Sequence, residues 1–368
     1  MKINEGSLQL ALQQMLPAPV TDIAYTASEL QGGTLGDVQL LQGSVSAAGV
    51  GTPFKLVYKR QQAWTRAGDP HSWRREYDLY TSKLADYFDD QLRWAKAYHV
   101  EATPEEITLW LEYLEGASGK ELTVSTLTAA AYQLGSLQGR IAKNPEQLHS
   151  CTNLGDPGFL EREYSQWLHQ HYDYDYLVSP QCRLPQHIKM LLQEGSITLI
   201  PGKSFEYSLL RSPACDLPGH LQDMLLAADA QASELFQRFK NLPVLFCHRD
   251  FWVENIIQTP GFIGLIDWDT TGWGYLGEDL ASLLVDDIAA DLIPELAAKA
   301  IPAYIEGLSS YIELPSPQLV TECIWEMALV KFGYRLMASS MYKQNPTERE
   351  EVVKILECIH QGRINYGY

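Results

Sequence analysis

The sequence predicts an α+β protein with two lobes, a small antiparallel-sheet lobe followed by a larger, mostly helical lobe. Short strand-like runs separated by glycine turns fill residues 1–115, whereas helical periodicity dominates from about residue 119. The chain of 368 residues is also too long for a single ordinary hydrophobic core and suits two domains or lobes. We therefore place the lobe boundary near Gly116, with lobes of 1–115 and 116–368.

Charge and composition narrow the functional classes. The chain has 46 acidic and 28 basic residues, a formal net charge of −18. Such a field repels nucleic acids and anionic membranes and favours a cationic ligand, although ordinary solubility explains an acidic surface equally well. No apolar run approaches a membrane span of about 20 residues, and the N-terminus has no signal-peptide pattern, so we expect a cytoplasmic protein. The six scattered cysteines include no C-x-x-C pair, which argues against a zinc site.

The N-terminal lobe is predicted to be a meander of strands with one main helix. Residues 27–45 indicate a strand, a glycine-rich turn and a second strand. In the next strand, Phe54-Lys55-Leu56-Val57-Tyr58-Lys59, alternate residues should face opposite sides of the sheet. Asp69-Pro70 is typical of a helix start, with Asp69 as the N-cap. Residues 106–116 indicate a strand that runs into a turn.

The C-terminal lobe is predicted to be helical around two short strands. The Ala- and Leu-rich segment 126–141 and the segment 319–337 have helical periodicity. Between them, the apolar runs 244–247 and 262–266 read as strands that flank a polar loop. The packing of residues 150–240 is not predicted.

The loop and the second strand carry the candidate chemistry. Asp250 and Asn255 lie in the loop, and Asp267 follows the second strand, so the three oxygen-bearing side chains can converge on one cleft. Mg²⁺ prefers hard oxygen ligands, and phosphoryl transfer needs a further carboxylate that orients the attacking hydroxyl group. A single loop Asp or Asn more often makes a turn or a cap, but the complete pattern favours phosphoryl transfer.

The motif His248-Arg249-Asp250-Phe251-Trp252-Val253-Glu254-Asn255, with Leu265-Ile266-Asp267-Trp268-Asp269, resembles the aminoglycoside phosphotransferase and choline kinase superfamily, a relative of protein kinases. The resemblance implies a protein-kinase-like bilobal fold and a kinase that uses ATP and Mg²⁺. It implies Asp250 as the catalytic base, Asn255 and Asp267 as metal ligands, and Asp269 as an auxiliary metal or supporting residue. His248 and Asp279 would give structural support, Asp279 by capping a helix and bracing the loop.

The same resemblance assigns the nucleotide site to the first lobe. Lys59 would reach the α- and β-phosphates, and Glu76 would pair with it. The glycines Gly32, Gly33 and Gly36 would let the backbone approach the phosphates. The backbone around Glu112, Tyr113 and Leu114 would bind adenine. Val57 and Leu111 could line the adenine pocket or belong to the core, and the sequence leaves both interpretations open.

Departures from protein kinases indicate a small-molecule acceptor. Asp267-Trp268-Asp269 stands in place of D-F-G, no A-P-E segment follows, and Gln138 stands where the family helix often has His. We expect an amine-bearing acceptor: an aminoglycoside-like antibiotic, which would imply antibiotic resistance, or a choline-like, sugar or amino-alcohol metabolite. Candidate acceptor-binding residues are Glu161, Glu163, Asp173, Asp175, Trp325 and Glu326. The alternative is a non-catalytic nucleotide-binding regulatory or scaffold protein that keeps the kinase-like fold.

Overall fold

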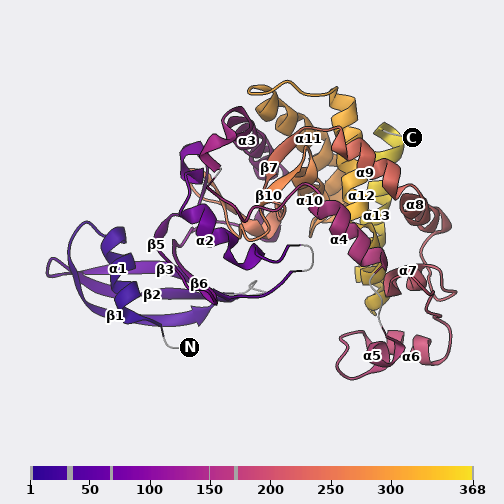
Figure 1. The fold of residues 1–368 in the computed structure, drawn as a ribbon, viewed down its shortest axis with the longest axis horizontal. Coiled ribbons are helices and arrows are strands. Elements are labelled where there is room, and N and C mark those ends of the chain that lie inside the picture. Colours follow the sequence, from indigo (N-terminus) through magenta and orange to yellow (C-terminus); the bar gives the residue numbers. More distant parts are fainter. Residues whose placement is uncertain (1–2, 31–35, 67–68, 149, 170–172, 367–368) are drawn as a thin grey trace. The chain divides into compact units, whose positions relative to one another are not determined.

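The computed structural model describes residues 3–30, 36–66, 69–148, 150–169 and 173–366. The chain forms two compact units, which we call unit 1 and unit 2. Unit 1 comprises residues 1–122, 140–155 and 254–271, and unit 2 comprises residues 123–139, 156–253 and 272–368. The predicted α+β class, with an antiparallel sheet in the N-terminal region and helices in the C-terminal region, is confirmed (Figure 1). Unit 1 also takes in two segments that follow the lobe boundary suggested by the sequence.

The main sheet of unit 1 is antiparallel, with the strand order β1-β2-β3-β6-β5. Its strands are β1 (Val20–Glu29), β2 (Asp37–Ala47), β3 (Val50–Gln62), β5 (Ala97–Ala102) and β6 (Glu106–Glu112). Strand β3 lies at the centre of this order and pairs with β2 through residues 50–60 and with β6 through residues 56–62. This central strand carries Lys59.

The two faces of the sheet belong to two different cores, as the alternation in β3 predicts. Phe54, Leu56 and Tyr58 are buried on one face, where helix α1 (Glu5–Met15) packs. On the other face, side chains of α2 (Arg75–Tyr80) join Val57 in a second apolar cluster. Lys59 shares a face with Val57 and is therefore directed to the side that α2 covers.

The start of the main helix differs from the prediction. A short 3₁₀ helix begins at Ser72 and α2 begins at Arg75, so Asp69 is not the N-cap. The Asp69 carboxylate instead accepts a hydrogen bond from Nη2 of Arg75 at 2.6 Å. The capping prediction was wrong because a buried arginine competes for this carboxylate more strongly than a backbone N–H does.

A small three-stranded sheet, also in unit 1, positions the second half of the predicted site. Its strands are β4 (Leu92–Trp94), β9 (Ile263–Leu265) and β8 (Ile256–Gln258), in that order. The pair β8–β9 is an antiparallel hairpin in which Ile256 faces Leu265. Asn255 precedes this pair and Ile266 follows it, and Ile266 N–H donates to the Asn255 carbonyl oxygen at 3.1 Å. The hairpin thus holds Asn255 and the segment entering Asp267 at the same end.

Unit 2 is helical around the two-stranded antiparallel sheet of β7 (Val244–Cys247) and β10 (Gly272–Tyr275). Helix α10 (Glu278–Val285) is buried along its whole length. The 26-residue helix α12 (Pro317–Tyr342) packs against it (Figure 1). The other α-helices that begin in this unit are α3 (Val124–Lys143), α4 (Phe159–His169), α5 (Tyr174–Val178), α6 (Gln186–Gln193), α7 (Phe205–Leu210), α8 (Gly219–Ala230), α9 (Ala232–Lys240), α11 (Ile293–Ser309) and α13 (Pro346–Tyr366). The last turn of α3 belongs to unit 1.

Within the described part of the chain, every helix is too short or too polar to cross a lipid bilayer.

Candidate active site

The centre of the candidate site in unit 1 is Lys59, which binds two carboxylates. Its Nζ lies 2.6 Å from Glu76 of α2 and 2.6 Å from Asp267. The Glu76 side chain is 1% exposed and that of Lys59 is 13% exposed. Burial lowers the pKa of Lys59, but Asp267, Glu76 and Asp269 outweigh it and raise the pKa well above its ordinary value. Lys59 is therefore held as a fixed cation, and the expected pairing with Glu76 is present.

Helix α2 holds the segment after β9 as well as Lys59. Oε1 of Glu76 accepts the backbone N–H of Trp268 at 3.1 Å. The neighbouring Arg75 donates to the carbonyl oxygen of Asp269 at 2.7 Å. Asp267 lies between β9 and these contacts with a φ of +63°, a left-handed conformation that a non-glycine residue keeps only where its surroundings hold it. Sequence reasoning missed Arg75, because only its contacts distinguish it from a surface arginine.

Negative charge gathers around Asp267. Asp269 is buried, and its nearest cation, Arg66, has Nη2 3.6 Å from the Asp269 carboxylate. Burial and the neighbouring Asp267 raise the pKa of Asp269 to about 7. The carboxylates of Glu76, Asp267 and Asp269 thus face the two cations Lys59 and Arg66, and a further cation would be stabilised here.

This set of oxygen donors fits a hard divalent cation. The side chain of Asp267 is 38% exposed, and Asn255, which has an amide side chain, lies at the same end of the β8–β9 hairpin. Among the described residues, no three His, Cys, Asp or Glu side chains are grouped to hold a metal ion by themselves. Mg²⁺ usually takes one or two carboxylates and completes its shell with water and phosphate oxygens, so the donors present suit Mg²⁺ bound together with a phosphate ligand.

The predicted adenine side of the site lies at the end of β6. Leu111 and Leu114 are buried and Val57 is half-buried in the same cluster, together with Ile257 and Ile266. The backbone N–H of Glu112 donates to the carbonyl oxygen of Lys96 at 2.8 Å, and its carboxylate pairs with Arg93. Because the N–H group of Glu112 is already bonded, it is not available to adenine. The prediction that this backbone binds adenine therefore applies only to the later groups, from the Glu112 carbonyl group to Leu114.

The glycine-rich turn is described only at its end. Gly32 and Gly33 lie outside the described residues. A Cβ atom on Gly36 would lie 2.8 Å from the carbonyl oxygen of Arg60, so this position admits only glycine without a backbone shift. The close approach of the backbone to β3 is enough to explain why residue 36 is glycine. A role in phosphate binding is not needed to explain it.

In unit 2, the loop after β7 carries Asp250 next to a residue with a strained backbone. Arg249 has a φ of +68°, which costs about 1–3 kcal/mol and persists only where other contacts hold it. Its N–H donates to Oδ1 of Asp279 at 2.6 Å, and the N–H of His248 donates to Oδ2 of Asp279 at 3.0 Å. The Arg249 side chain is buried and donates to two backbone carbonyl oxygens. The residue before Asp250 is thus held at both its backbone and its side chain.

Asp279 does not cap α10, contrary to the prediction. The N-cap is Gly277, with a φ of +95°. The carboxylate of Asp279 is already occupied by the loop and by Gln138, whose Nε2 lies 2.9 Å away. Oε1 of Gln138 accepts the Tyr304 hydroxyl at 2.6 Å, so the amide is held from both ends. Gln138 therefore contacts the carboxylate that holds the loop carrying Asp250.

We expect Asp279→Asn to change how stability depends on pH. Burial raises the pKa of Asp279 to about 6, from an ordinary value of 3.8, although the N–H of Arg249 opposes the rise. Since the folded state then holds the proton more tightly than the unfolded chain, ionised Asp279 lowers stability above pH 6, and this cost fades as the pH falls towards 4. Relative to the variant, the wild type should gain about 1 kcal/mol of unfolding free energy between about pH 7.5 and pH 5.

Urea unfolding of both proteins at the two pH values measures this gain. Asp223→Asn, an exposed position on α8 in the same unit, is the matched control and should show no such change. A difference between wild type and Asp279→Asn that stays constant with pH would show that the carboxyl has an ordinary pKa in the folded protein.

Most of the acceptor-binding candidates have structural roles. Trp325 and Glu326 are buried in α12, and Glu326 pairs with Nε of Arg363 at 3.0 Å, so the prediction that they face an acceptor was wrong. Asp173 is the N-cap of α5. Glu161 pairs with Lys240 at the surface.

A different carboxylate, which sequence reasoning missed, belongs to the surroundings of Asp250. Asp286 follows α10, and burial raises its pKa, with Asp250 contributing to the rise and Arg335 and Lys331 opposing it. Asp287, next in the chain, is exposed and also contributes to the rise. In the sequence, only the two consecutive Asp residues could have pointed to a role near Asp250. Two Asp residues at a solvent-exposed helix end are equally common without such a role.

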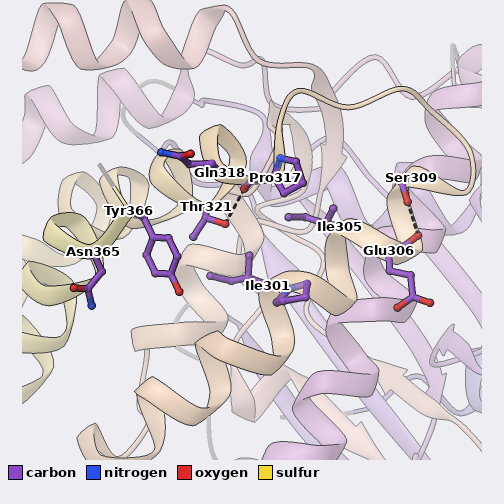
Figure 2. Close-up of a pocket in the computed structure, with 10 residues that line it drawn as sticks. Ile301, Ile305, Glu306, Ser309, Pro317, Gln318, Thr321, Asn365 and Tyr366 are labelled. Atoms are coloured by element: carbon purple, nitrogen blue, oxygen red, sulfur yellow. Dashed lines mark hydrogen bonds between the residues drawn. The ribbon is translucent and has the colours of Figure 1, made fainter. Parts of the chain in front are cut away.

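A groove elsewhere in unit 2 does not involve any of these residues. It is lined by the second half of α11, the first turns of α12 and the end of α13, and includes Ile301, Thr321 and Tyr366 (Figure 2). Figure 2 shows two of its hydroxyl groups bonded within their own helices: Thr321 donates to the Pro317 carbonyl oxygen and Ser309 to the Glu306 carbonyl oxygen. None of the predicted site residues is among those that line it.

A model of the phosphotransferase enzyme family (APH) matches residues 66–314. The chain belongs to this family. The predicted enzyme class is therefore confirmed: the protein is a phosphotransferase. The match includes the loop with Asp250, the β8–β9 hairpin and Glu76, whereas Lys59 precedes it.

Solved structures similar to this phosphotransferase include three kinases. A choline kinase from Cryptosporidium parvum is 13% identical, with 93% of this chain and 88% of that chain covered and a TM-score of 0.47. An ethanolamine kinase from Plasmodium vivax is 14% identical, with 91% and 81% covered and a TM-score of 0.49. The ADP-bound aminoglycoside phosphotransferase APH(2'')-Ib is 15% identical, with 94% and 95% covered and a TM-score of 0.47. A comparison with curated proteins gives no match.

Proposed function

We propose that this phosphotransferase moves the γ-phosphoryl group of ATP to a hydroxyl group of an amine-bearing small molecule, with Mg²⁺ as cofactor. The observation that carries the proposal is Lys59, largely shielded from solvent and held between Glu76 and Asp267 at 2.6 Å from each. A surface lysine has no need of two carboxylates, whereas a lysine that must bind phosphate has to be positioned and charged. A cytoplasmic location, where ATP is available, belongs to the same proposal.

In this proposal the nucleotide is bound by unit 1. Lys59 neutralises phosphate oxygens while Glu76 fixes its position. Gly36 would let the backbone approach the phosphates, and the same role is expected of Gly32 and Gly33, which lie outside the described residues. Adenine is bound by backbone groups beyond the Glu112 N–H, at Tyr113 and Leu114, against the apolar surface that includes Val57. These roles are supported by the burial and pairing of Lys59 and by the continuity of the apolar cluster.

Asn255 and Asp267 would hold Mg²⁺, with Asp269 beside them. When bound, Mg²⁺ would neutralise phosphate charge and polarise the bond that breaks. The chain's own contribution is to keep these oxygens in place: the β8–β9 hairpin positions Asn255, and α2 holds the backbone after Asp267. The three neighbouring carboxylates support a cation here, because their mutual repulsion falls when it binds.

Asp250 of unit 2 would orient the acceptor hydroxyl group and accept its proton as the O–P bond forms. Asp279 and the contacts of Arg249 support this role, since they hold the backbone next to Asp250 in a conformation that the chain would not keep by itself. Asp286 and Asp287 supply further negative charge in the surroundings of Asp250. This charge, and the net charge of −18, support a cationic acceptor.

Paired acceptors test the proposal. ADP release from MgATP would be measured with two matched pairs of acceptors, ethanolamine compared with ethylene glycol and glucosamine compared with glucose. Choline, aminopropanol and kanamycin would be measured as further amine-bearing acceptors. We expect at least one amine-bearing hydroxyl compound to raise ADP release well above the basal rate, and its neutral partner to be a poorer acceptor. Higher turnover with the neutral partners would overturn the amine preference. MgATP binding without turnover on any hydroxyl acceptor would favour the scaffold alternative.

A further inference from the structure

Lys331 of α12 has contacts that the proposed chemistry does not explain. Its Nζ donates to the carbonyl oxygen of Arg249 at 2.6 Å and to Oγ of Ser282 in α10 at 2.7 Å. Lys331 is half-buried, and it lies in a run of buried residues of α12. A lysine needed only for solubility would extend its ammonium group into water. This ammonium group instead joins α12, α10 and the loop after β7.

The acceptor of the first bond matters most. The carbonyl group of Arg249 belongs to the same peptide unit as the N–H of Asp250, so its orientation determines the direction in which the Asp250 side chain leaves the backbone. The other peptide group of Arg249, its N–H, is bound by Asp279. Both peptide groups of a residue with a φ of +68° are therefore held by charged side chains from two helices, the buried Asp279 of α10 and the half-buried Lys331 of α12.

A plain electrostatic role for Lys331 is the competing explanation. Its charge opposes the rise in the pKa of Asp279 and of Asp286, two carboxyls that burial penalises. The same two carboxyls also respond to other charges: Glu278 adds to the rise at Asp279, whereas at Asp286 Asp250 adds to it and Arg335 opposes it. Charge balance alone requires a cation in this region, but it does not require a 2.6 Å hydrogen bond to one particular carbonyl oxygen.

We propose that Lys331 is a positioning residue for phosphoryl transfer, which holds the Arg249–Asp250 peptide so that Asp250 points at the acceptor hydroxyl group. This inference rests on the proposed role of Asp250. It predicts an effect on turnover that is separate from nucleotide binding, because every side chain assigned to the nucleotide belongs to unit 1 and Lys331 belongs to unit 2.

The test compares Lys331→Met, Lys331→Arg and the control Lys354→Met. Met keeps the length and apolar stem of Lys331 but cannot donate, whereas Arg restores both donor and charge. Lys354 is an exposed lysine on α13 of the same unit and pairs only across one helical turn, with Glu350. For each variant, kcat and KM would be measured with the panel acceptor that turns over fastest, together with the Kd for MgATP and the thermal midpoint.

We expect Lys331→Met to lower kcat about 10- to 100-fold, the scale of a misplaced catalytic group, with the Kd for MgATP within about twofold of wild type. Lys331→Arg should recover most of that loss, and Lys354→Met should match the wild type. If Lys331→Met does not fold, Lys331→Gln, which keeps a donor without charge, replaces it and should show a smaller loss of kcat in the same direction.

Three outcomes would overturn the inference, and Asp250→Asn measured in parallel distinguishes the first two. An inactive Asp250→Asn beside a fully active Lys331→Met would refute the role of Lys331 alone. An active Asp250→Asn would refute the proposed role of Asp250 in the reaction. Lys331 would then have no catalytic carboxylate to position. A loss of kcat in Lys331→Met that only follows weaker MgATP binding or a smaller folded fraction would also contradict the positioning role.

Discussion

Asp250→Asn should lower kcat at least about 100-fold, the scale of a lost general base, and leave the Kd for MgATP nearly unchanged. The amide keeps the size of the carboxylate but cannot accept a proton from the acceptor hydroxyl group. Nucleotide affinity should persist because Lys59, Glu76, Asp267 and the apolar cluster all belong to unit 1, whereas Asp250 belongs to unit 2.

The two parameters are measured separately, kcat by acceptor-dependent ADP release and Kd by calorimetric titration with MgATP. Asp223→Asn, the exposed position on α8, is the control for the same chemical change in the same unit. Unchanged turnover in Asp250→Asn would rule out its role as the base. A parallel loss of MgATP binding would instead mean that the carboxylate contributes to the nucleotide site.

Lys59→Met is expected to reduce both activity and stability. Met keeps most of the side-chain volume but removes the cation between Glu76 and Asp267. Breaking a buried ion pair from one side costs about 3–5 kcal/mol, and we expect the lower end, about 3 kcal/mol, because Glu76 keeps its hydrogen bond from Trp268 and Asp267 is partly exposed. Turnover should fall by about two orders of magnitude or more, since a phosphate-binding charge is lost.

A double variant separates the two effects. Lys59→Met with Glu76→Gln removes the uncompensated buried charge, so part of the lost stability should return while activity stays low. Lys55→Met is the matched control, because Lys55 lies on the same face of β3 but its pair with Glu115 is exposed to solvent. Recovery of activity in the double variant would contradict a phosphate-binding role for Lys59.

Stability would be followed by hydrogen–deuterium exchange of peptides from β3 and β6, together with calorimetry. A chain of two compact units can unfold in more than one transition, so a local probe in unit 1 is needed. Faster exchange in β3 and β6 for Lys59→Met, but not for Lys55→Met, is the expected result.

Local patterns were sufficient for much of the fold. The alternation in β3 predicted which of its side chains enter which core, because a strand directs successive residues to opposite faces whatever lies beyond. The apolar runs 244–247 and 262–266 were correctly read as strands, and segment 126–141 as a helix. Asp69 and Asp279 show the limit of this reasoning, because each is a reasonable cap by local rules. Asp69 is instead bound by the buried side chain of Arg75, and Asp279 by two N–H groups of a loop that is distant in sequence.

The sequence by itself indicated Asp250, Asn255 and Asp267 as candidate chemical groups, because residue type and spacing are local properties. Its resemblance to a known kinase superfamily added Lys59 and Glu76. The tertiary structure decided which groups hold these residues. Arg75, Gln138 and Lys331 act through buried or partly buried hydrogen bonds to atoms more than fifty positions away, and such bonds leave no periodicity in the sequence. Folding also divided the catalytic segment between Val253 and Glu254, with Asp250 in unit 2 and Asn255 in unit 1, a boundary set by long-range packing and not by any local signal.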